Sequence, residues 1–314
     1  MRSALVKWLT SKAKLDSRIF LLTADLGYSV LESYVEEHSE RFLNVGVAEQ
    51  NMVGVATGLA MEGFLPYTYS IGIFPTFRCA EQIRNDIDYH CLPVVTCSVG
   101  SGVAYGNLGY SHHAIQDLSL MRSLPNMVIA TPADPLEVQG ILDWHYKNPC
   151  PLYLRLHKAG EPQLGVSETQ LELGALRPVW RPSIQASTSE EPQICILAIG
   201  HIAGRVVNLS HSKSSSIPVY SVPLWGRPAS KQFSEQISEY DVVITVEDHV
   251  LEGGFGSYVM EVAAANSLKA RVIPVALGAE VVGSVAREET LLKPLIKVIE
   301  DLLDLGASNT LPRC

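Results

Sequence analysis

Short apolar runs alternate along the chain with longer stretches in which apolar residues recur at helical spacing. The expected strands comprise residues 18–23, 93–98, 127–130, 152–156, 193–199, 219–222, 242–246 and 271–275. Helical stretches separate these runs. Regular alternation of strands with helices favours mostly parallel sheets flanked by helices. The pattern therefore predicts an α/β fold.

Helix signals support this prediction at three places. Residues 1–18 carry polar and charged side chains throughout and are typical of an amphipathic helix. Residues 49–62 form a helical stretch rich in glycine and alanine. Asp134 is placed to cap a helix that has Pro135 at its first position.

A change of composition divides the chain. Residues 161–192 are rich in Pro, Ser, Glu and Thr and have little apolar periodicity, which is typical of a linker. We expect a first domain at residues 1–160 and a second at residues 193–314. Each should contain its own mostly parallel sheet flanked by helices.

The overall composition narrows the class of protein. The formal net charge is -9, which argues against a nucleic-acid partner because phosphate binding relies on clustered Lys and Arg. No apolar stretch approaches the roughly 20 residues needed to span a bilayer. The six cysteines include no CxxC pair and predict neither a zinc site nor a disulfide framework. We expect a cytoplasmic protein with no membrane partner and with reduced, buried thiols.

The residues around Glu49 are the most informative part of the sequence. Glu49 is an acid inside the apolar, small-residue segment at residues 41–63. A carboxyl group there is partly desolvated, which favours its protonated form. Such acids are enriched at functional sites, although structural ion pairs produce them too. From the residues alone, a functional and a structural role remain open.

The segment NVGVAEQNMVGVATGLA, residues 44–60, resembles a motif in the pyrimidine-binding domain of transketolases and 1-deoxy-xylulose-5-phosphate synthases. The resemblance implies thiamine diphosphate as cofactor. It also implies that Glu49 hydrogen-bonds N1′ of the aminopyrimidine and favours the imino tautomer, which takes the proton from the thiazolium C2. Glu49 is thus the expected catalytic and cofactor-binding residue.

Two further segments match in register. In TADLGYS, the resemblance places Asp25 and Leu26 near the cofactor and Ser29 near a substrate phosphate. In IFPTFRCAEQIRND, it places an aromatic ring on the pyrimidine. Phe74 is the better match because it keeps its spacing to Arg78, a predicted substrate-binding residue, and Phe77 is the alternate.

The glycine-rich segment at residues 100–134 resembles the family's next signature loop. His112 matches a substrate-contacting histidine that binds and polarises a sugar oxygen, and it is the second expected catalytic residue. His113 is a further substrate-binding candidate. Leu108 stands where many transketolases carry an acid that reads a donor hydroxyl. We therefore expect an altered sugar or oxo substrate.

The resemblance continues to the end of the chain. Lys158 takes the place of a substrate-phosphate arginine, with Arg155 upstream. Residues 242–264 resemble the transketolase C-terminal domain. Their GGFGS string is better explained by a tight strand-to-helix turn than by dinucleotide binding. His249 lies in the same motif and has a weaker claim to function.

One part of the family's usual enzyme is missing from the sequence. The chain has no GDG motif, which in the family marks the domain that binds the diphosphate and its metal. We therefore expect no metal ligand on this chain. A separate N-terminal-half subunit would hold the diphosphate and Mg²⁺ or Ca²⁺, and an α2β2 assembly would share the cofactor.

These observations predict the β subunit of a split transketolase, which transfers a two-carbon ketol unit from a ketose or its phosphate to an aldehyde. Two alternatives stay open. One is a pyruvate-using subunit of the deoxyxylulose-phosphate-synthase or 2-oxo acid dehydrogenase E1β type. The other is a non-catalytic scaffold subunit that keeps the fold.

Overall fold

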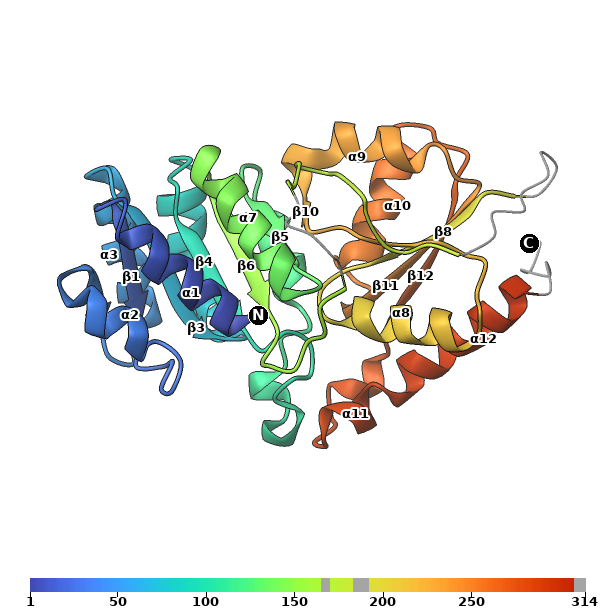
Figure 1. Ribbon diagram of the computed structural model, residues 1–314, viewed down its shortest axis with the longest axis horizontal. Coiled ribbons are helices and arrows are strands. Elements are labelled where there is room, and N and C mark those ends of the chain that lie inside the picture. The colour runs from blue at the N-terminus through green and yellow to red at the C-terminus, as the bar shows by residue number, and fades with distance from the viewer. Residues whose placement is uncertain (165–169, 183–191, 308–314) are drawn as a thin grey trace.

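The computed structural model describes residues 1–164, 170–182 and 192–307. Two sheets lie side by side in it, one built mainly from the first half of the chain and one from the second (Figure 1). Each sheet has helices on both of its faces, as the sequence predicts. Parts of the expected linker, at 165–169 and 183–191, and Cys314 lie outside the described residues.

The first half contains these helices and strands: α1 Arg2–Ala13, β1 Ile19–Thr23, α2 Glu32–Glu37, η1 Ser39–Arg41, β2 Phe42–Asn44, α3 Glu49–Met61, β3 Leu65–Ile71, α4 Phe74–Phe77, α5 Ala80–Gln82, η2 Ile83–Asp88, β4 Val95–Val99, η3 Gly106–Leu108, η4 Tyr110–His112, α6 Asp117–Met121, β5 Val128–Ala130, α7 Pro135–Lys147 and β6 Leu152–Leu156.

The second half contains these: β7 Arg177–Trp180, β8 Ile194–Ala198, α8 Ile202–Ser212, β9 Val219–Ser221, β10 Leu224–Trp225, η5 Arg227–Ala229, α9 Ser230–Ile237, β11 Val242–Val250, α10 Phe255–Ala265, β12 Arg271–Leu277, η6 Ala279–Val281, α11 Glu288–Leu291 and α12 Lys293–Ala307.

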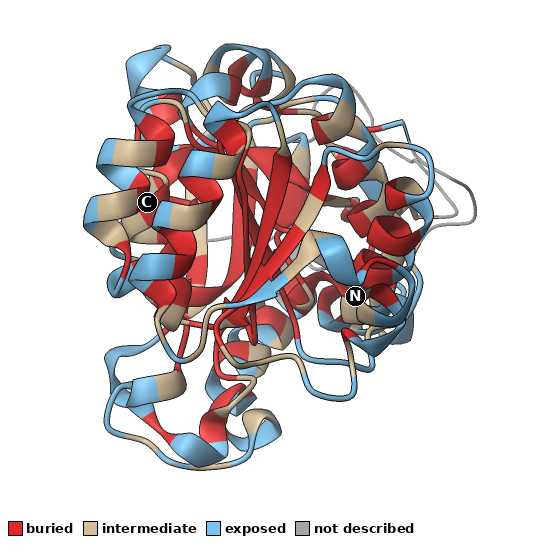
Figure 2. Cartoon of the chain, turned by 90° about the vertical axis from the view of Figure 1, so that its left-hand side faces the viewer, coloured by how far each residue is buried: buried red, intermediate tan, exposed pale blue. Residues whose placement is uncertain are grey.

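The first sheet has the strand order β10-β5-β6-β4-β3-β1-β2, and all its strands except β10 run parallel. Helices α1 and α7 cover one face and share a core with Leu21, Tyr67 and Val95. Helix α3 covers the other face, where Met52 and Val53 pack with Leu22 and Tyr153. Figure 2 shows the buried strands between exposed helical surfaces. Because β1 to β4 are parallel, the loops that follow them meet at one edge of the sheet.

The second sheet has the order β12-β11-β8-β9-β7, with β7 antiparallel to β9. Helices α8 and α12 pack on one face, in a core that contains Ile196 and Ile244. Helix α10 packs on the other face, and its Phe255 belongs to the same apolar core as Met52 of α3. One apolar core therefore runs from the first domain into the second.

Each sheet also contains one strand from outside the part of the chain that was predicted to form it. The expected linker contains β7, an edge strand of the second sheet. Its Pro178 made the segment look unstructured, but an edge strand tolerates proline because one side of it needs no ladder hydrogen bonds. In the opposite direction, β10 from the second half pairs with β5 in the first sheet.

Most of the predicted elements are confirmed within one or two residues. The prediction for β6 matches the observed Leu152–Leu156, and Asp134 caps α7 by accepting a 2.8 Å hydrogen bond from the Glu137 amide. The sequence pattern did not predict β3, because LPYTYSI mixes polar residues into a strand that is buried on both faces. The strand expected at 242–246 also continues four residues further, since β11 ends at Val250.

The cysteines differ from expectation at one position. Cys79, Cys97 and Cys195 are buried free thiols, but Cys91 is exposed, so the prediction of buried thiols was wrong for that residue.

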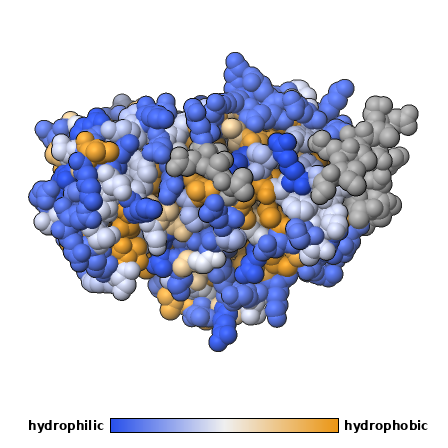
Figure 3. Space-filling model, in the orientation of Figure 1, coloured by the Kyte–Doolittle hydropathy of each residue, from blue (hydrophilic) through white to orange (hydrophobic). Residues whose placement is uncertain are grey.

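On the face drawn in Figure 3, apolar side chains gather in separate small patches among polar ones. Within the described ranges, no helix is both long enough and apolar enough to cross a membrane.

Candidate active site

Glu49 is the first residue of α3, and its side chain is only 4% exposed. Its Oε1 accepts a 2.9 Å hydrogen bond from Nη1 of Arg78. The neighbouring Gln50 donates from Nε2 to the backbone carbonyl of Arg78 at 2.9 Å. A carboxylate at a helix N-terminus is favoured by the helix dipole. Arg78 is thus attached to the start of α3 by its side chain and by its backbone.

Phe74 and His112 continue this cluster. The Arg78 guanidinium lies 4.0 Å from the centre of the Phe74 ring, and the His112 ring meets Phe74 edge to face with centroids 5.2 Å apart. These residues come from the loops after β2, β3 and β4. The carboxyl ends of these parallel strands bring them together, which is where ligands bind in open α/β sheets.

Phe77 lies differently from Phe74. Its side chain is 52% exposed and lines a groove whose other wall includes Val250, Leu251 and Val282. Phe74 is instead held between Arg78 and His112. Which of the two rings stacks on a pyrimidine remains a prediction in favour of Phe74.

The loop after β4 presents His112 and covers His113. Nδ1 of His112 lies 3.0 Å from the Ser111 hydroxyl, and partial burial together with the charge of Arg78 lowers the pKa of His112. Both effects favour the neutral form of His112. His113 is fully buried, and Leu108 is 56% exposed. Of these three predicted site residues, His112 and Leu108 can reach a ligand from their present positions.

The loop after β1 holds two non-glycine residues in the left-handed region, Asp25 at φ 55° and Ser29 at φ 60°. Asp25 accepts hydrogen bonds from Tyr28 and from the side chain of Asn44, and these lower its pKa. Leu26 is fixed by the Thr23 hydroxyl, which donates to its carbonyl. Backbone strain of this kind clusters at functional sites, where the surrounding structure maintains it.

A group of cations lies beside Ser29. Ser29 and Arg2 line the same pocket, which also contains Lys7 and Lys14. Burial raises the pKa of Tyr69 to about 12, and nearby Arg2 opposes this rise. Arg2 was not among the predicted site residues, since a single arginine next to the first residue gives no pattern.

Lys158 extends the same cationic region. Its Nζ lies 5.1 Å from the centre of the Tyr105 ring. Burial raises the pKa of Tyr105, and the charge of Arg2 opposes that shift. Tyr105 is therefore influenced by two cations, Arg2 and Lys158.

Arg155 has a different role from its neighbour Lys158. It is buried, and its guanidinium pairs with Asp117 at 2.8 Å and with Asp248 at 2.5 Å. It also donates to the Ala114 carbonyl at 2.8 Å. Because its donors are used inside the protein, Arg155 links the two domains and Lys158 is the cation left to face a ligand.

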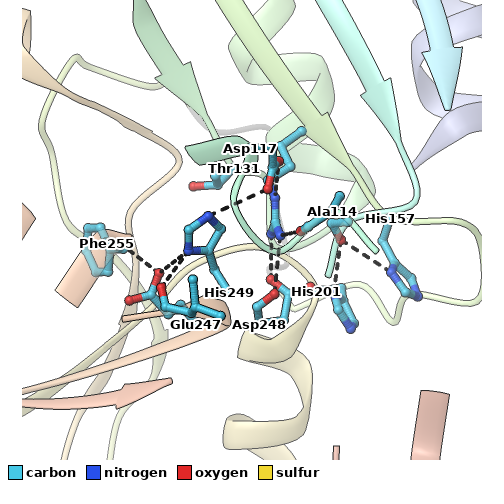
Figure 4. A network of polar contacts seen from close by, with 12 residues as sticks. Ala114, Asp117, Thr131, His157, His201, Glu247, Asp248, His249 and Phe255 are labelled. Carbon is cyan, nitrogen blue, oxygen red and sulfur yellow. Dashed lines mark hydrogen bonds and ion pairs between the residues drawn. The ribbon is translucent and has the colours of Figure 1, made fainter. Parts of the chain in front are cut away.

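The GGFGS motif of the second domain is a structural turn. Glu247 accepts hydrogen bonds of 2.7 Å from the amides of Phe255 and Gly256, at the start of α10. A Cβ atom at Gly254 would collide with the Glu247 carboxylate, and one at Gly256 would lie only 2.9 Å from Cβ of Pro274. The prediction of a tight strand-to-helix turn is thus confirmed. His249 is completely buried close to Asp117 and Glu247 (Figure 4).

The cluster around Glu49 fits one end of thiamine diphosphate. A mostly buried carboxylate beside an aromatic ring can bind the ring nitrogen and the face of an aminopyrimidine. The described residues contain one group of three His, Cys, Asp or Glu side chains spaced to hold a metal ion, and neither Glu49 nor Asp25 belongs to it. The residues present therefore fit the pyrimidine end of the cofactor.

The loops at one edge of the parallel sheet thus gather a buried acid, a cation and an aromatic ring. Residues 1–162 match the family described as "Transketolase, pyrimidine binding domain". The chain therefore belongs to the transketolase pyrimidine-binding family.

Relatives extend the match over both domains. The chain is 29% identical to a putative transketolase C-terminal section of Methanocaldococcus jannaschii, over 93% of this chain and 90% of that one. It is 30% identical to one of the subunits of the apulose-4-phosphate transketolase of Actinobacillus succinogenes, over 74% and 72% of the two chains. It is 29% identical to the 1-deoxy-D-xylulose-5-phosphate synthase of Clostridium kluyveri, but spans only 42% of that protein.

Solved structures agree with this assignment. A structure described as "Split gene transketolase, inactive beta4 tetramer" superposes with a TM-score of 0.78 at 28% identity, and the match covers 98% of this chain and 97% of that one. The transketolase of Campylobacter jejuni shares the fold at a TM-score of 0.71 and 19% identity, and the chain covers 46% of it. The chain is thus similar over nearly its whole length to a subunit of a split-gene transketolase.

Proposed function

We propose that this chain is the pyrimidine-binding subunit of a thiamine-diphosphate-dependent transketolase and that it works only with a diphosphate-binding partner. The observation that carries the proposal is Glu49, a nearly buried carboxylate at the start of α3 beside Phe74 and Arg78. It lies in a chain whose relatives along its length are separate transketolase sections and subunits.

In this proposal the residues of the chain prepare the cofactor and hold the sugar. When bound, thiamine diphosphate supplies the carbanion that accepts the two-carbon unit. Glu49 binds the pyrimidine ring nitrogen and governs its protonation, and Phe74 supports the ring face. Arg78 would share the Glu49 carboxylate with a bound pyrimidine or give it up, because it already binds Oε1.

The sugar contacts follow from charge and protonation. Neutral His112 donates a hydrogen bond to, or accepts one from, a sugar oxygen without the desolvation cost of a buried charge. Lys158, Arg2 and Ser29 provide cations and a hydroxyl for a phosphate group at the other end of the substrate. A phosphorylated ketose is thus the favoured donor class.

The partner and the donor are further parts of the proposal. We infer an α2β2 assembly in which the N-terminal-half subunit holds the diphosphate and Mg²⁺ or Ca²⁺. Leu108 replaces a hydroxyl-reading acid with an exposed apolar side chain. The donor should therefore differ from xylulose 5-phosphate at that hydroxyl, and two relatives named for apulose 4-phosphate suggest that sugar for testing.

Pyruvate chemistry remains the second candidate. The synthase relatives are 28–31% identical and match this chain with about two fifths of their own length. An apolar residue at position 108 would suit pyruvate, which has no hydroxyl to read. Release of CO₂ from pyruvate by the assembled enzyme, without ketol transfer from any ketose, would favour this candidate.

The deciding experiment uses the chain reconstituted with its diphosphate-binding partner. Glu49→Gln should lower kcat by about three orders of magnitude or more, because the side chain loses its acid function at the cofactor. Glu62→Gln is the matched control, since Glu62 is an exposed glutamate at the other end of the same helix. Unchanged turnover in Glu49→Gln would support a scaffold subunit instead.

A further inference from the structure

His157, His201 and Glu288 meet at the seam between the two domains. His157 follows β6 of the first sheet, His201 precedes α8, and Glu288 begins α11. The two imidazole rings lie face to face with centroids 3.7 Å apart and planes within 12° of parallel. Three side chains of metal-ligand type thus converge from segments that are far apart in the sequence.

The donor atoms have the spacing of a coordination shell. Oε1 of Glu288 lies 3.0 Å from Nε2 of His201 and 3.5 Å from Nε2 of His157. In a tetrahedral site with bonds of about 2.0–2.1 Å, donor atoms are about 3.3 Å apart. Glu288 and His201 form an ion pair, and the buried Nε2 of His201 makes no hydrogen bond of ordinary geometry in the described part of the chain.

The second nitrogen of each ring, Nδ1, also has polar neighbours. Nδ1 of His201 lies 3.2 Å from the buried Oδ2 of Asp248, and the Nδ1 atoms of both rings lie 3.4 Å from the Ser101 hydroxyl (Figure 4). Metal-binding histidines usually have a carboxylate or another polar group at the second nitrogen, which fixes the ring and directs the first nitrogen to the metal. The arrangement Asp248–His201–Glu288 has this order.

The local charge also favours a cation. Asp248 and Glu288 flank the histidines, and Asp117 lies on the far side of Arg155. Arg155 is the one permanent cation that the described contacts bring to these three carboxylates, and it is shared by two of them. The Glu288 side chain keeps 19% of its surface exposed, which provides an entry path for an ion.

We propose that His157, His201 and Glu288 form a binding site for a divalent transition-metal ion of the zinc class, which joins the two domains. The two nitrogens and one carboxylate are ligands that zinc prefers, and solvent would complete the coordination. The site is separate from Glu49 and requires no thiamine diphosphate.

The test titrates Zn²⁺ into the metal-free full-length chain and follows binding by calorimetry and by competition with a chromophoric chelator. We expect one equivalent per chain and a rise in melting temperature. Co²⁺ should give the strong visible bands of a four-coordinate ion. His157→Gln and Glu288→Gln should each weaken Zn²⁺ binding at least about tenfold, by analogy with the cost of disturbing a metal site.

His90→Gln is the matched control, because His90 is an exposed histidine outside the cluster. Glu288→Gln preserves shape at a partly exposed position, so it keeps the test valid if His157→Gln does not fold. The proposal is overturned if Zn²⁺ binds no better than to the double variant His157→Gln/Glu288→Gln. It is also overturned if His90→Gln removes the same equivalent. In either case the cluster would be an internal ion pair between His201 and its two carboxylates.

Discussion

Arg78 holds the carboxylate of Glu49 with a 2.9 Å hydrogen bond while its guanidinium lies against the Phe74 ring. One cation therefore contacts both the acid and the aromatic ring assigned to the pyrimidine. The Arg78 side chain is 48% exposed, so it can move into solvent once the buried Glu49 has another partner. This arrangement makes Arg78 a competitor of the cofactor for Glu49.

Arg78→Gln should therefore tighten the binding of thiamine diphosphate to the assembled enzyme. Partly exposed ion pairs contribute about 0.2–1 kcal/mol, so the dissociation constant should fall by up to about fivefold. Fluorescence titration with the cofactor measures it, and Arg84→Gln serves as a control at an exposed arginine of the next helical turn. Weakening by more than about tenfold would instead make Arg78 a cofactor ligand.

Phe74 and Phe77 can be separated by alanine substitution. Stacking of an aromatic side chain on a base contributes about 1–3 kcal/mol, so Phe74→Ala should raise the cofactor dissociation constant by about ten- to a hundredfold. Phe77→Ala should have a smaller effect, because that ring lies on the surface beside the groove near Val282. The opposite ranking would assign the stacking role to Phe77.

Lys158 and Arg2 should act on the phosphate of the donor. Lys158→Gln should raise KM for a phosphorylated ketose by about tenfold or more, since a charge-assisted contact is lost. KM for the same ketose without phosphate should hardly change. Arg2→Gln should behave alike, and Lys147→Gln, on α7, is the control. Equal effects on both ketoses would place these cations outside the phosphate site.

Leu108→Asp should move the preference towards ordinary ketose phosphates. An acid at this exposed loop position can accept a hydrogen bond from a donor hydroxyl, and a buried polar contact of this kind changes discrimination by orders of magnitude. We expect kcat/KM for xylulose 5-phosphate to rise at least about tenfold relative to Leu108→Asn. No change in the ratio between donors would show that position 108 does not read the sugar.

His145 should make the stability of the first domain depend on pH. It is fully buried on α7 and hydrogen-bonds the Cys150 carbonyl at 2.9 Å, and burial lowers its pKa from 6.5 to about 4. The folded form resists protonation of His145. Its contribution to the free energy of unfolding is therefore fully present above pH 6.5 and is lost as the pH falls towards 4. The full loss is roughly 3 kcal/mol.

Urea unfolding between pH 4 and pH 7.5 measures this effect. His145→Gln keeps a donor for the Cys150 carbonyl but does not titrate, so its stability should fall less steeply below pH 6.5. The exposed His90→Gln should retain the slope of the unsubstituted chain. Identical slopes in all three proteins would contradict the prediction.

The local sequence was sufficient to predict features whose physical causes lie in neighbouring residues. The apolar runs marked β6 and β11, Asp134 and Pro135 marked the start of α7, and the glycines of GGFGS marked a tight turn. The family motif also located Glu49 at a helix start. Strand β3 was missed because its burial on both faces depends on neighbours, while its polar residues gave no apolar run.

The tertiary structure decided which residues meet. The residues around Arg2 in the sequence do not predict that it lies near Tyr105. Those around Arg155 do not predict that Arg155 pairs across the two domains while Lys158 lies outside. Likewise, β7 lay inside an expected linker, and His157, His201 and Glu288 are far apart in sequence. The sequence by itself determined the family, the α/β pattern and the helix that carries Glu49, because spacing and residue type encode these features. Packing between distant segments decided which charged side chains pair with each other. The physical reason is that these side chains become buried and paired only when the two domains pack around a common core.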